Sequence, residues 1–166
     1  MKRFLPVLFA LFACTPSPTV THSAPRAADV ASPEALVDAF YAVVNLAPGE
    51  ARQWDRDRTL YLPGIRFVGL SGDGELETYS HEELIAATEP MIAGGFRERE
   101  LHRRVRRFGH MVHVDSTYQT HYQDRPHRGV NSIDMVFDGR RWWIASVTWQ
   151  TESPRFHIPA DLLPPG

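Results

Sequence analysis

The residues of this chain that could do chemistry are mainly histidines, carboxylates and arginines in its C-terminal half. His113 and Asp115 are two positions apart and His121 has the same parity, so on a β-strand all three would share one face. Two histidines and a carboxylate can hold zinc or iron. However, the 8 histidines are scattered without a tight ligand-spacing motif, and alternating polar residues are typical of a solvated strand face. We therefore expect no metal and no other cofactor.

Segment 97–107 is the most highly charged part of the chain. On a strand of period two its even-numbered residues share one face: Glu98, Glu100, His102, Arg104 and Arg106. If that face lined a site, Arg104 or Arg106 could bind an anionic ligand through paired hydrogen bonds. A solvated ribbon, in which glutamates offset arginines, explains the same pattern and is favoured. The net charge of −2 argues against nucleic-acid binding, which draws on a strongly basic surface.

Residues 1–14 have the features of an export signal. Two basic residues precede the apolar run 4–12, which is too short to span a bilayer, because a spanning helix needs roughly 20 apolar residues. Residues 11–14, Leu-Phe-Ala-Cys, resemble a bacterial lipobox, in which the cysteine is lipidated and becomes the new N-terminus. The residue after Cys14 is not aspartate, which favours sorting to the outer membrane. We expect an exported protein held in the bacterial cell envelope by a lipid on Cys14 alone.

Cys14 is the only cysteine, so no disulfide can form within the chain and no cysteine nucleophile is expected. The sequence also contains no glycine-rich phosphate loop and no nucleophile elbow. Residues 15–32 are rich in Pro, Ser, Thr and Ala, which predicts a flexible tether. Residues 33–166 then form one domain of ordinary size.

Local signals predict the order helix, strand, helix and then a run of strands. Ser32 is expected to cap a first helix, and Ser80 a second one that ends at two glycines, 94 and 95. Strands are expected in segments 59–68, 96–108, 108–118, 129–137 and 142–149, with a turn at 69–74. Asp138-Gly139 predicts a tight hairpin between the last two. This grouping indicates an α+β domain with helices on one face of a curved sheet.

The domain resembles the nuclear-transport-factor-2-like superfamily, which includes SnoaL-like and ketosteroid-isomerase-like domains, and is most similar to a branch of uncharacterised bacterial lipoproteins. The matching features, in order, are Trp54-Asp55, Leu60-Tyr61-Leu62-Pro63-Gly64, the Phe108-Gly109 corner, Gly129 with Asn131-Ser132, Trp142-Trp143-Ile144 and Trp149. The resemblance implies a cone-shaped fold in which N-terminal helices pack on a strongly bent antiparallel β-sheet. It does not imply one function, because the fold hosts isomerases, cyclases, dehydratases and binding modules.

The catalytic residues of the ketosteroid isomerases do not carry over. These enzymes use a tyrosine on the first helix, a carboxylate base and a protonated carboxylic acid. By spacing to Asn45, the tyrosine position is Phe40, with Tyr41 one residue away. The base would fall near residues 62–63, which are Leu and Pro. We therefore assign no catalytic residues from the resemblance.

The open end of the implied cone is the expected binding site. The candidate pocket residues are Tyr41, His102, Arg104, Tyr118, Asn131 and Asp134. At least three of the five strand residues should converge with Tyr41 on one cavity. An ionisable group held in such a partly apolar cavity should have a perturbed pKa, because desolvation opposes its charged form.

The aromatic residues have two interpretations. An apolar ligand cavity could be walled by Trp54, Trp142, Trp143 and Trp149 with Tyr118, but packing in the core or at a dimer interface is favoured. Successive Trp142 and Trp143 must point to opposite faces of a strand. The pairs Trp142 with Ile144 and Trp143 with Val147 would leave neither face polar, so we expect a homodimer through the outward face.

The hypothesis we favour is a domain without a catalytic set that binds a small apolar or amphipathic molecule, or a protein of the cell envelope. The alternative is an isomerase or dehydratase that acts on a small molecule. It would use Tyr41 or Tyr118 with one of His102, His113, Asp115 and Asp134. A third possibility is a structural envelope protein whose cone is filled by side chains. The openness and lining of the cavity distinguish the three.

Overall fold

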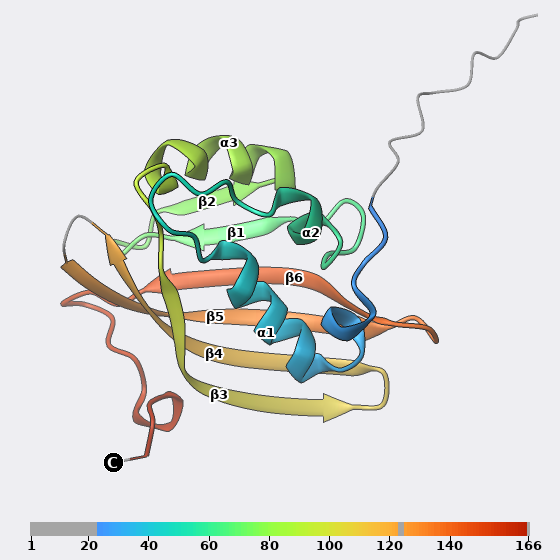
Figure 1. Ribbon diagram of the computed structural model, residues 1–166. Coiled ribbons are helices and arrows are strands. Elements are labelled where there is room, and N and C mark those ends of the chain that lie inside the picture. The colour runs from blue at the N-terminus through green and yellow to red at the C-terminus, as the bar shows by residue number, and fades with distance from the viewer. Residues whose placement is uncertain (1–22, 123–124, 166) are drawn as a thin grey trace, which may run out of the picture.

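Six strands form one curved, mixed sheet in the order β2-β1-β6-β5-β4-β3 (Figure 1). A computed structural model describes residues 23–122 and 125–165 of the chain, so the predicted signal peptide, Cys14 and residues 15–22 lie outside the described residues. The strands are β1 (Phe67–Leu70), β2 (Leu76–Tyr79), β3 (Glu98–Phe108), β4 (Met111–Tyr122), β5 (Arg125–Phe137) and β6 (Trp142–Thr151). Neighbouring strands are antiparallel except β1 and β6, which are parallel. The expected antiparallel sheet therefore describes β3 to β6, and β1 joins it through a parallel pairing.

Three α-helices pack with this sheet: α1 (Pro33–Val44), α2 (Trp54–Arg58) and α3 (His81–Ile92). The predicted caps are confirmed, because the Ser32 Oγ accepts from the Ala35 N–H at 3.1 Å, and Ser80 and Glu83 form a capping box. The 3₁₀ turn η1 (Ala27–Val30) packs beside α1 with Val30 buried. The packed part of the chain thus begins before Pro33, inside the segment expected to be a tether.

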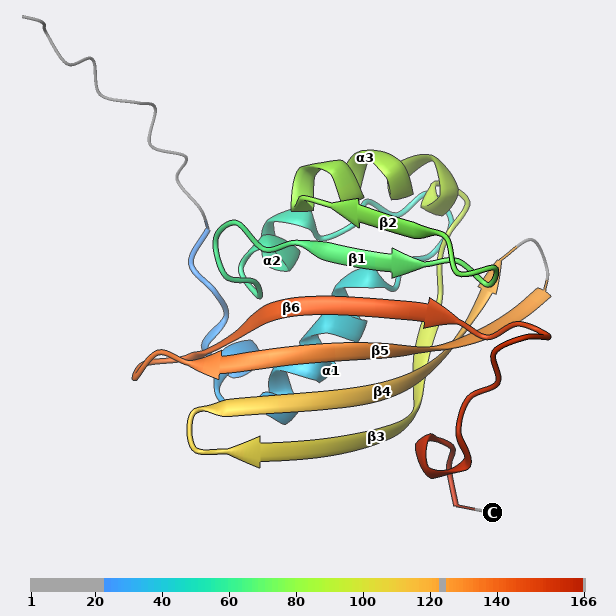
Figure 2. The same ribbon diagram turned by 180° about the vertical axis from the view of Figure 1, so that it is seen from behind.

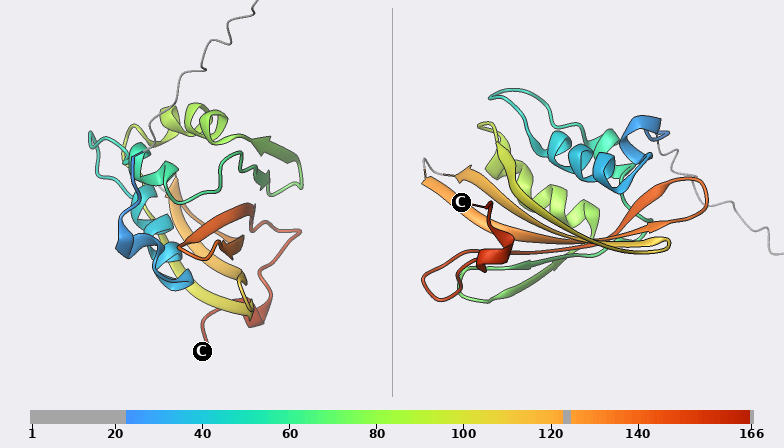
Figure 3. Two further views of the ribbon diagram at one scale, coloured as in Figure 1. Left: turned by 90° about the vertical axis from the view of Figure 1, so that its right-hand side faces the viewer. Right: turned by 90° about the horizontal axis from the view of Figure 1, so that it is seen from below.

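The core lies between α1 and one face of the sheet, which we call the inner face; the opposite face is the outer face (Figures 1 and 3). Leu36, Val37 and Val43 of α1 are fully buried in the same cluster as Val114, Ile133 and Ile144 of the strands. Removal of such side chains from water stabilises the fold by about 25 cal/mol per Å² of apolar surface. This packing fixes which side of each strand faces α1.

The outer face carries the end of the chain. After β6 the chain turns back past the ends of β5, β4 and β3 and ends near the turn η2 (Ala160–Leu162) (Figures 2 and 3). The Thr117 hydroxyl of β4 donates to the Leu162 carbonyl, and Arg104 of β3 pairs with Asp161. The tail therefore covers part of the outer face.

Two predicted elements differ from the structure. The strand expected at 59–68 is confined to β1, and Tyr61 makes only an isolated bridge to Ile144. The reason is local, since Pro63 has no backbone N–H to donate and Gly64 has a φ of 79°, which interrupts an extended segment. Gly69 was expected in the following turn but lies in β1. A glycine is required at this position because the Trp149 ring packs closely against it. Both hairpin corners are confirmed, at Gly109 and at Asp138-Gly139.

Two β-bulges change which residues share a face. The pairing of β3 with β4 skips Leu101, and the pairing of β6 with β5 skips Ala145. Because side chains alternate along a strand, one extra residue reverses the parity of every residue after it. The predicted pair of Trp143 and Val147 is therefore wrong: Val147 is buried on the inner face with Trp142.

Candidate functional site

A cavity of about 340 Å³ opens between the inner face of the sheet, α1 and α3. Its walls are largely apolar and aromatic, with Phe40 from α1, Phe96 before β3 and Trp149 from β6. Its polar lining residues include Arg52 before α2, Glu98 of β3, Tyr118 of β4, and His127 and Asn131 of β5. An apolar cavity with a few convergent polar groups is the usual form of a small-molecule site.

Two glycines make room for the aromatic walls. Tyr118 is paired across the sheet with Gly129, and Trp149 with Gly69. A Cβ at Gly129 would lie 2.4 Å from the Tyr118 hydroxyl oxygen, and one at Gly69 would lie 2.7 Å from the Trp149 ring. Each ring therefore lies directly over the backbone of the neighbouring strand, a position that a larger residue would block.

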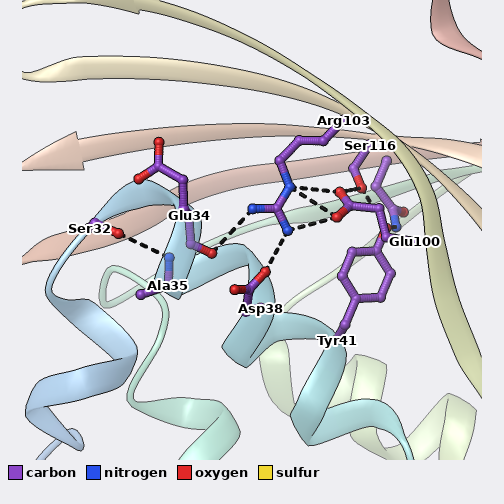
Figure 4. Close-up of polar contacts among 9 residues, drawn as sticks. Ser32, Glu34, Ala35, Asp38, Tyr41, Glu100, Arg103 and Ser116 are labelled. Atoms are coloured by element: carbon purple, nitrogen blue, oxygen red, sulfur yellow. Dashed lines mark hydrogen bonds and ion pairs between the residues drawn. The ribbon is translucent and has the colours of Figure 1, made fainter. Parts of the chain in front are cut away.

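Below the cavity, a chain of polar contacts joins α1 to β3 and β4 (Figure 4). Arg103 of β3 donates to the Glu100 carboxylate at 2.7 Å and to Asp38 of α1 at 2.6 Å. The Ser116 hydroxyl of β4 donates to the same Glu100 carboxylate. The Tyr41 hydroxyl lies 2.6 Å from the Ser116 oxygen.

The direction of this chain follows from counting protons. Ser116 has one hydroxyl proton and gives it to Glu100, so Tyr41 must donate to Ser116. The Tyr41 oxygen in turn accepts from the amide of Asn131 at 3.2 Å. Burial raises the pKa of Tyr41, so its hydroxyl stays protonated. Tyr41 thus orients Asn131, and its own proton points away from the cavity.

Glu98 is the ionisable group at the cavity end of the same network. Its backbone is fixed by Asn45, which donates to its carbonyl and accepts from its N–H, both at 2.8 Å. The Asn131 amide is 3.4 Å from its carboxylate. Burial raises the pKa of Glu98 from 4.5 to about 7, against the hydrogen bond from Asn131 and the charge of Arg52. Near neutral pH, this carboxyl can therefore hold or release a proton.

Tyr118 is the second polar group of the cavity. Its hydroxyl lies 3.2 Å from the Thr151 hydroxyl, and either oxygen can be the donor. Burial raises the pKa of Tyr118 to about 12, so it is a neutral hydrogen-bonding group at physiological pH. The side chain is 4% exposed and lies deep in the cavity wall.

Behind the cavity lies a buried cluster around Asp57. Its carboxylate accepts from the Tyr61 hydroxyl at 2.8 Å, is 2.9 Å from the His81 Nε2 and is 3.7 Å from the Arg52 guanidinium. Arg52 also lies 4.0 Å over the ring of Trp54. The cluster holds α2, the start of α3 and the loop before α2 together, and it positions Arg52 at the cavity edge.

The structure brings together only some of the predicted pocket residues. Tyr118 and Asn131 line the cavity, whereas Tyr41 lies on the inner face in contact with Asn131 but is not part of the lining. His102 and Arg104 follow the Leu101 bulge and pair with Thr117 and Asp115, which places them on the outer face. Two of the five strand candidates thus converge, fewer than the three expected.

Asp134 also lies on the outer face, in a different network. It accepts from His113 at 2.8 Å and from Ser146 at 2.8 Å, and the other ring nitrogen of His113 is 3.0 Å from Asp115. Burial opposes a charge on His113, but the two carboxylates outweigh it and raise its pKa. His121 does not take part in this contact set, and within 23–122 and 125–165 no His, Cys, Asp or Glu side chains are grouped as metal ligands would be.

Glu98 and Arg52 are the site residues that sequence reasoning missed. Glu98 was grouped with His102 and Arg104 by simple alternation, and no local signal places a bulge between them. Arg52 lies in a loop without periodicity. Glu98 pairs with Thr120 of β4, and that pairing cannot be read from one sequence.

A larger hollow of about 670 Å³ lies between the start of α3 and Trp143, on the other side of Tyr61, which lines both cavities. Three arginines line it, but each has a partner: Arg58 has Asp55, Arg66 has Glu83, and Arg141 has the Thr59 carbonyl. Residues 23–25 form part of its wall. Since each of these arginines already has a hydrogen-bond or ion-pair partner, we take the inner-face cavity as the candidate site.

These features define a cone-shaped α+β domain with one inner-face cavity, and solved structures have the same architecture. The chain is similar to a nuclear-transport-factor-2-like protein of unknown function from Silicibacter pomeroyi (16% identity, 74% of this chain and 94% of that one, TM-score 0.53). It is similar to another nuclear-transport-factor-2-like protein of unknown function, from Pseudomonas putida (13% identity, 70% of this chain and 82% of that one, TM-score 0.54). A third similar structure is a Parabacteroides distasonis protein proposed to be a ketosteroid isomerase (10% identity, 75% of this chain and 90% of that one, TM-score 0.53).

The fold is therefore the nuclear-transport-factor-2-like fold that the sequence resemblance implies. No protein-family model matches the chain, and no curated protein matches it. In the described part of the chain, no helix is long and apolar enough to cross a membrane.

Proposed function

We propose that this protein binds a small amphipathic molecule in the inner-face cavity. The observation that carries the proposal is the convergence of Glu98, Tyr118 and Asn131 on an open cavity with aromatic walls. A structural domain would fill this space, since protein interiors pack to the density of organic crystals. The apolar walls suit the body of a ligand, and the three polar groups suit one polar end.

A neutral fluorescent probe, prodan, tests whether the cavity takes a ligand. Thr88 lines the cavity from α3, whereas the neighbouring Ala87 is exposed. Thr88→Trp should fill the cavity and weaken prodan binding by about tenfold or more, a loss of about 1.4 kcal/mol. Ala87→Trp adds the same ring outside the cavity and should leave binding unchanged. Equal binding by both variants, or none by the original protein, would contradict the proposal.

The second candidate is an enzyme of the isomerase or dehydratase kind. It is favoured by one observation: burial raises the pKa of Glu98 to about 7, the range in which a general acid or base is most effective. Glu98 would exchange the proton, and Asn131 and Tyr118 would hold the substrate. Deuterium uptake from D₂O into small cyclic enones such as 2-cyclohexenone, abolished by Glu98→Gln, would support it. Enones that stay unlabelled leave the binding function as the better proposal.

We also propose export and lipid anchoring, supported by the lipobox-like segment that ends at Cys14. Stable anchoring needs more than one acyl chain or a second signal. Cys14→Ser protein should leave the membrane fraction, and full retention there would contradict the anchor. The homodimer and the envelope partner remain predictions, the first of which light scattering at tens of micromolar can test.

A further inference from the structure

The charges around the cavity are not balanced. Glu100 is matched by Arg103, and Arg52 faces Asp57 at 3.7 Å. Glu98 has no ion partner within 4.0 Å among residues 23–122 and 125–165. When Glu98 is ionised, its carboxylate therefore lies in the cavity without an ion partner of its own, because the guanidinium that lines the cavity, that of Arg52, faces Asp57.

The cavity gives that carboxylate little help from hydrogen bonds. The Asn131 amide is 3.4 Å away and also serves Tyr41. The Tyr118 hydroxyl is already in contact with Thr151. A charged group without a partner in apolar surroundings is costly, and a ligand that supplies the missing charge and N–H donors removes that cost.

Resting on the proposed binding function, we propose that the ligand is a small organic amine whose ammonium group pairs with Glu98 and whose apolar body lies among the aromatic walls. Aromatic faces attract cations electrostatically, so Trp149, Tyr118 and Phe96 are compatible with a positive ligand as well as with an apolar one. A carboxylate ligand would instead meet Glu98 as a like charge, and Arg52 is already engaged by Asp57.

The proposal fixes the direction of the pH dependence. The titratable and charged groups around Glu98 are Tyr41 of α1, Arg52 before α2, Glu100 of the same strand, Tyr118 of β4 and His127 of β5. The amine requires Glu98 ionised, so its affinity should rise with pH up to about 7 and then level off. A ligand that accepts a hydrogen bond from protonated Glu98 should show the opposite trend.

Three probes with one phenylethyl body test the charge preference: phenethylamine, phenethyl alcohol and hydrocinnamate, measured by calorimetry. At about pH 8 the amine is protonated, as a lysine side chain is. It should bind about tenfold tighter than the alcohol, since close charge pairs at interfaces contribute this much or more. Glu98→Gln should remove the advantage of the amine over the alcohol, whereas Glu75→Gln, at an exposed turn, should leave that advantage in place.

Tighter binding of the alcohol or of hydrocinnamate overturns the amine inference, and so does amine affinity that falls as pH rises toward 7. The pH profile is measured on the unaltered protein, so it decides even if Glu98→Gln folds poorly. If prodan binds but none of the three probes does, the inference fails and the proposed function stands. If prodan does not bind either, the proposed function fails as well.

Discussion

Residues one position apart on β4 belong to two polar networks on opposite faces of the sheet. Ser116 joins Glu100, Tyr41 and, through Asn131, Glu98 on the inner face. Asp115 joins the second network on the outer face, which is centred on His113. The inner network is buried under α1, whereas the outer one is solvent-accessible. Carboxylates therefore act in two dielectric environments, and burial decides how each network affects stability.

The two ionisable groups at the centres of these networks are shifted for opposite reasons. Burial disfavours the charged form of Glu98 and raises its pKa to about 7. Neighbouring carboxylates favour the charged form of His113 and raise its pKa as well. Both groups bind protons more tightly in the folded protein, so both should make the fold more stable at acidic than at neutral pH.

The largest expected effect is the pH dependence that comes from Glu98. The folded pKa of Glu98 lies above its unfolded value of 4.5. Stability should therefore fall by about 3 kcal/mol at most as pH rises from about 4.5 to 7, and it should then stay level. Urea unfolding of Glu98→Gln against the original protein measures this slope. The Glu98→Gln variant should lose this pH dependence and should be more stable than the original protein above pH 7. An unchanged slope would show that Glu98 is not the titrating group.

A smaller effect should come from the ion pair below the cavity. Arg103→Met leaves the Glu100 carboxylate, only 20% exposed, without its cation and should cost about 2 kcal/mol of unfolding free energy. Arg106 is on the same strand but is 61% exposed and 3.8 Å from Asp115. Arg106→Met should therefore cost less than about 0.5 kcal/mol. Equal losses would mean that the two faces are not energetically distinct.

The smallest effect should come from the outer network. His113→Gln removes two carboxylate contacts at a partly exposed site and should cost less than about 1 kcal/mol. The contribution of His113 should be complete below pH 6.5 and be lost as pH rises through its raised pKa. Salt should weaken it, because exposed charges are screened, whereas the Glu98 slope should persist. If the contribution of His113 to stability does not change with salt, its environment is less polar than the structure indicates.

The parts of the fold that could be predicted from the sequence are those with local causes. Ser32 and Ser80 cap helices through hydrogen bonds to residues three positions away, and Gly139 permits a tight turn by its own backbone freedom. The parallel pairing of β1 with β6 is a long-range choice and leaves no local pattern. The same distinction applies to the site, where Tyr41, Tyr118 and Asn131 were candidates because the implied fold places their elements around the open end of the cone.

Three predicted pocket residues lie on the outer face, and their positions could not be derived from the sequence: His102, Arg104 and Asp134. The first two are on the outer face because Leu101 is an extra residue in β3, and a bulge depends on how two strands pair rather than on either sequence alone. Asp134 alternates with buried residues that face α1, so it must point outward. Which parity faced the helices could not be known without the core contacts.

The Leu101 bulge also matters for how copies of this chain meet. β3 is an edge of the sheet, and beyond Glu98, whose N–H and C=O are bonded to Asn45, such an edge strand can present a row of unpaired N–H and C=O groups. Such an edge can recruit a strand from another molecule and start aggregation. A bulge makes the edge irregular, and the arginines along β3 would bring like charges into contact if two edges paired. The Leu101 bulge, which turns the later side chains of β3 to the opposite face, thus also hinders edge-to-edge association.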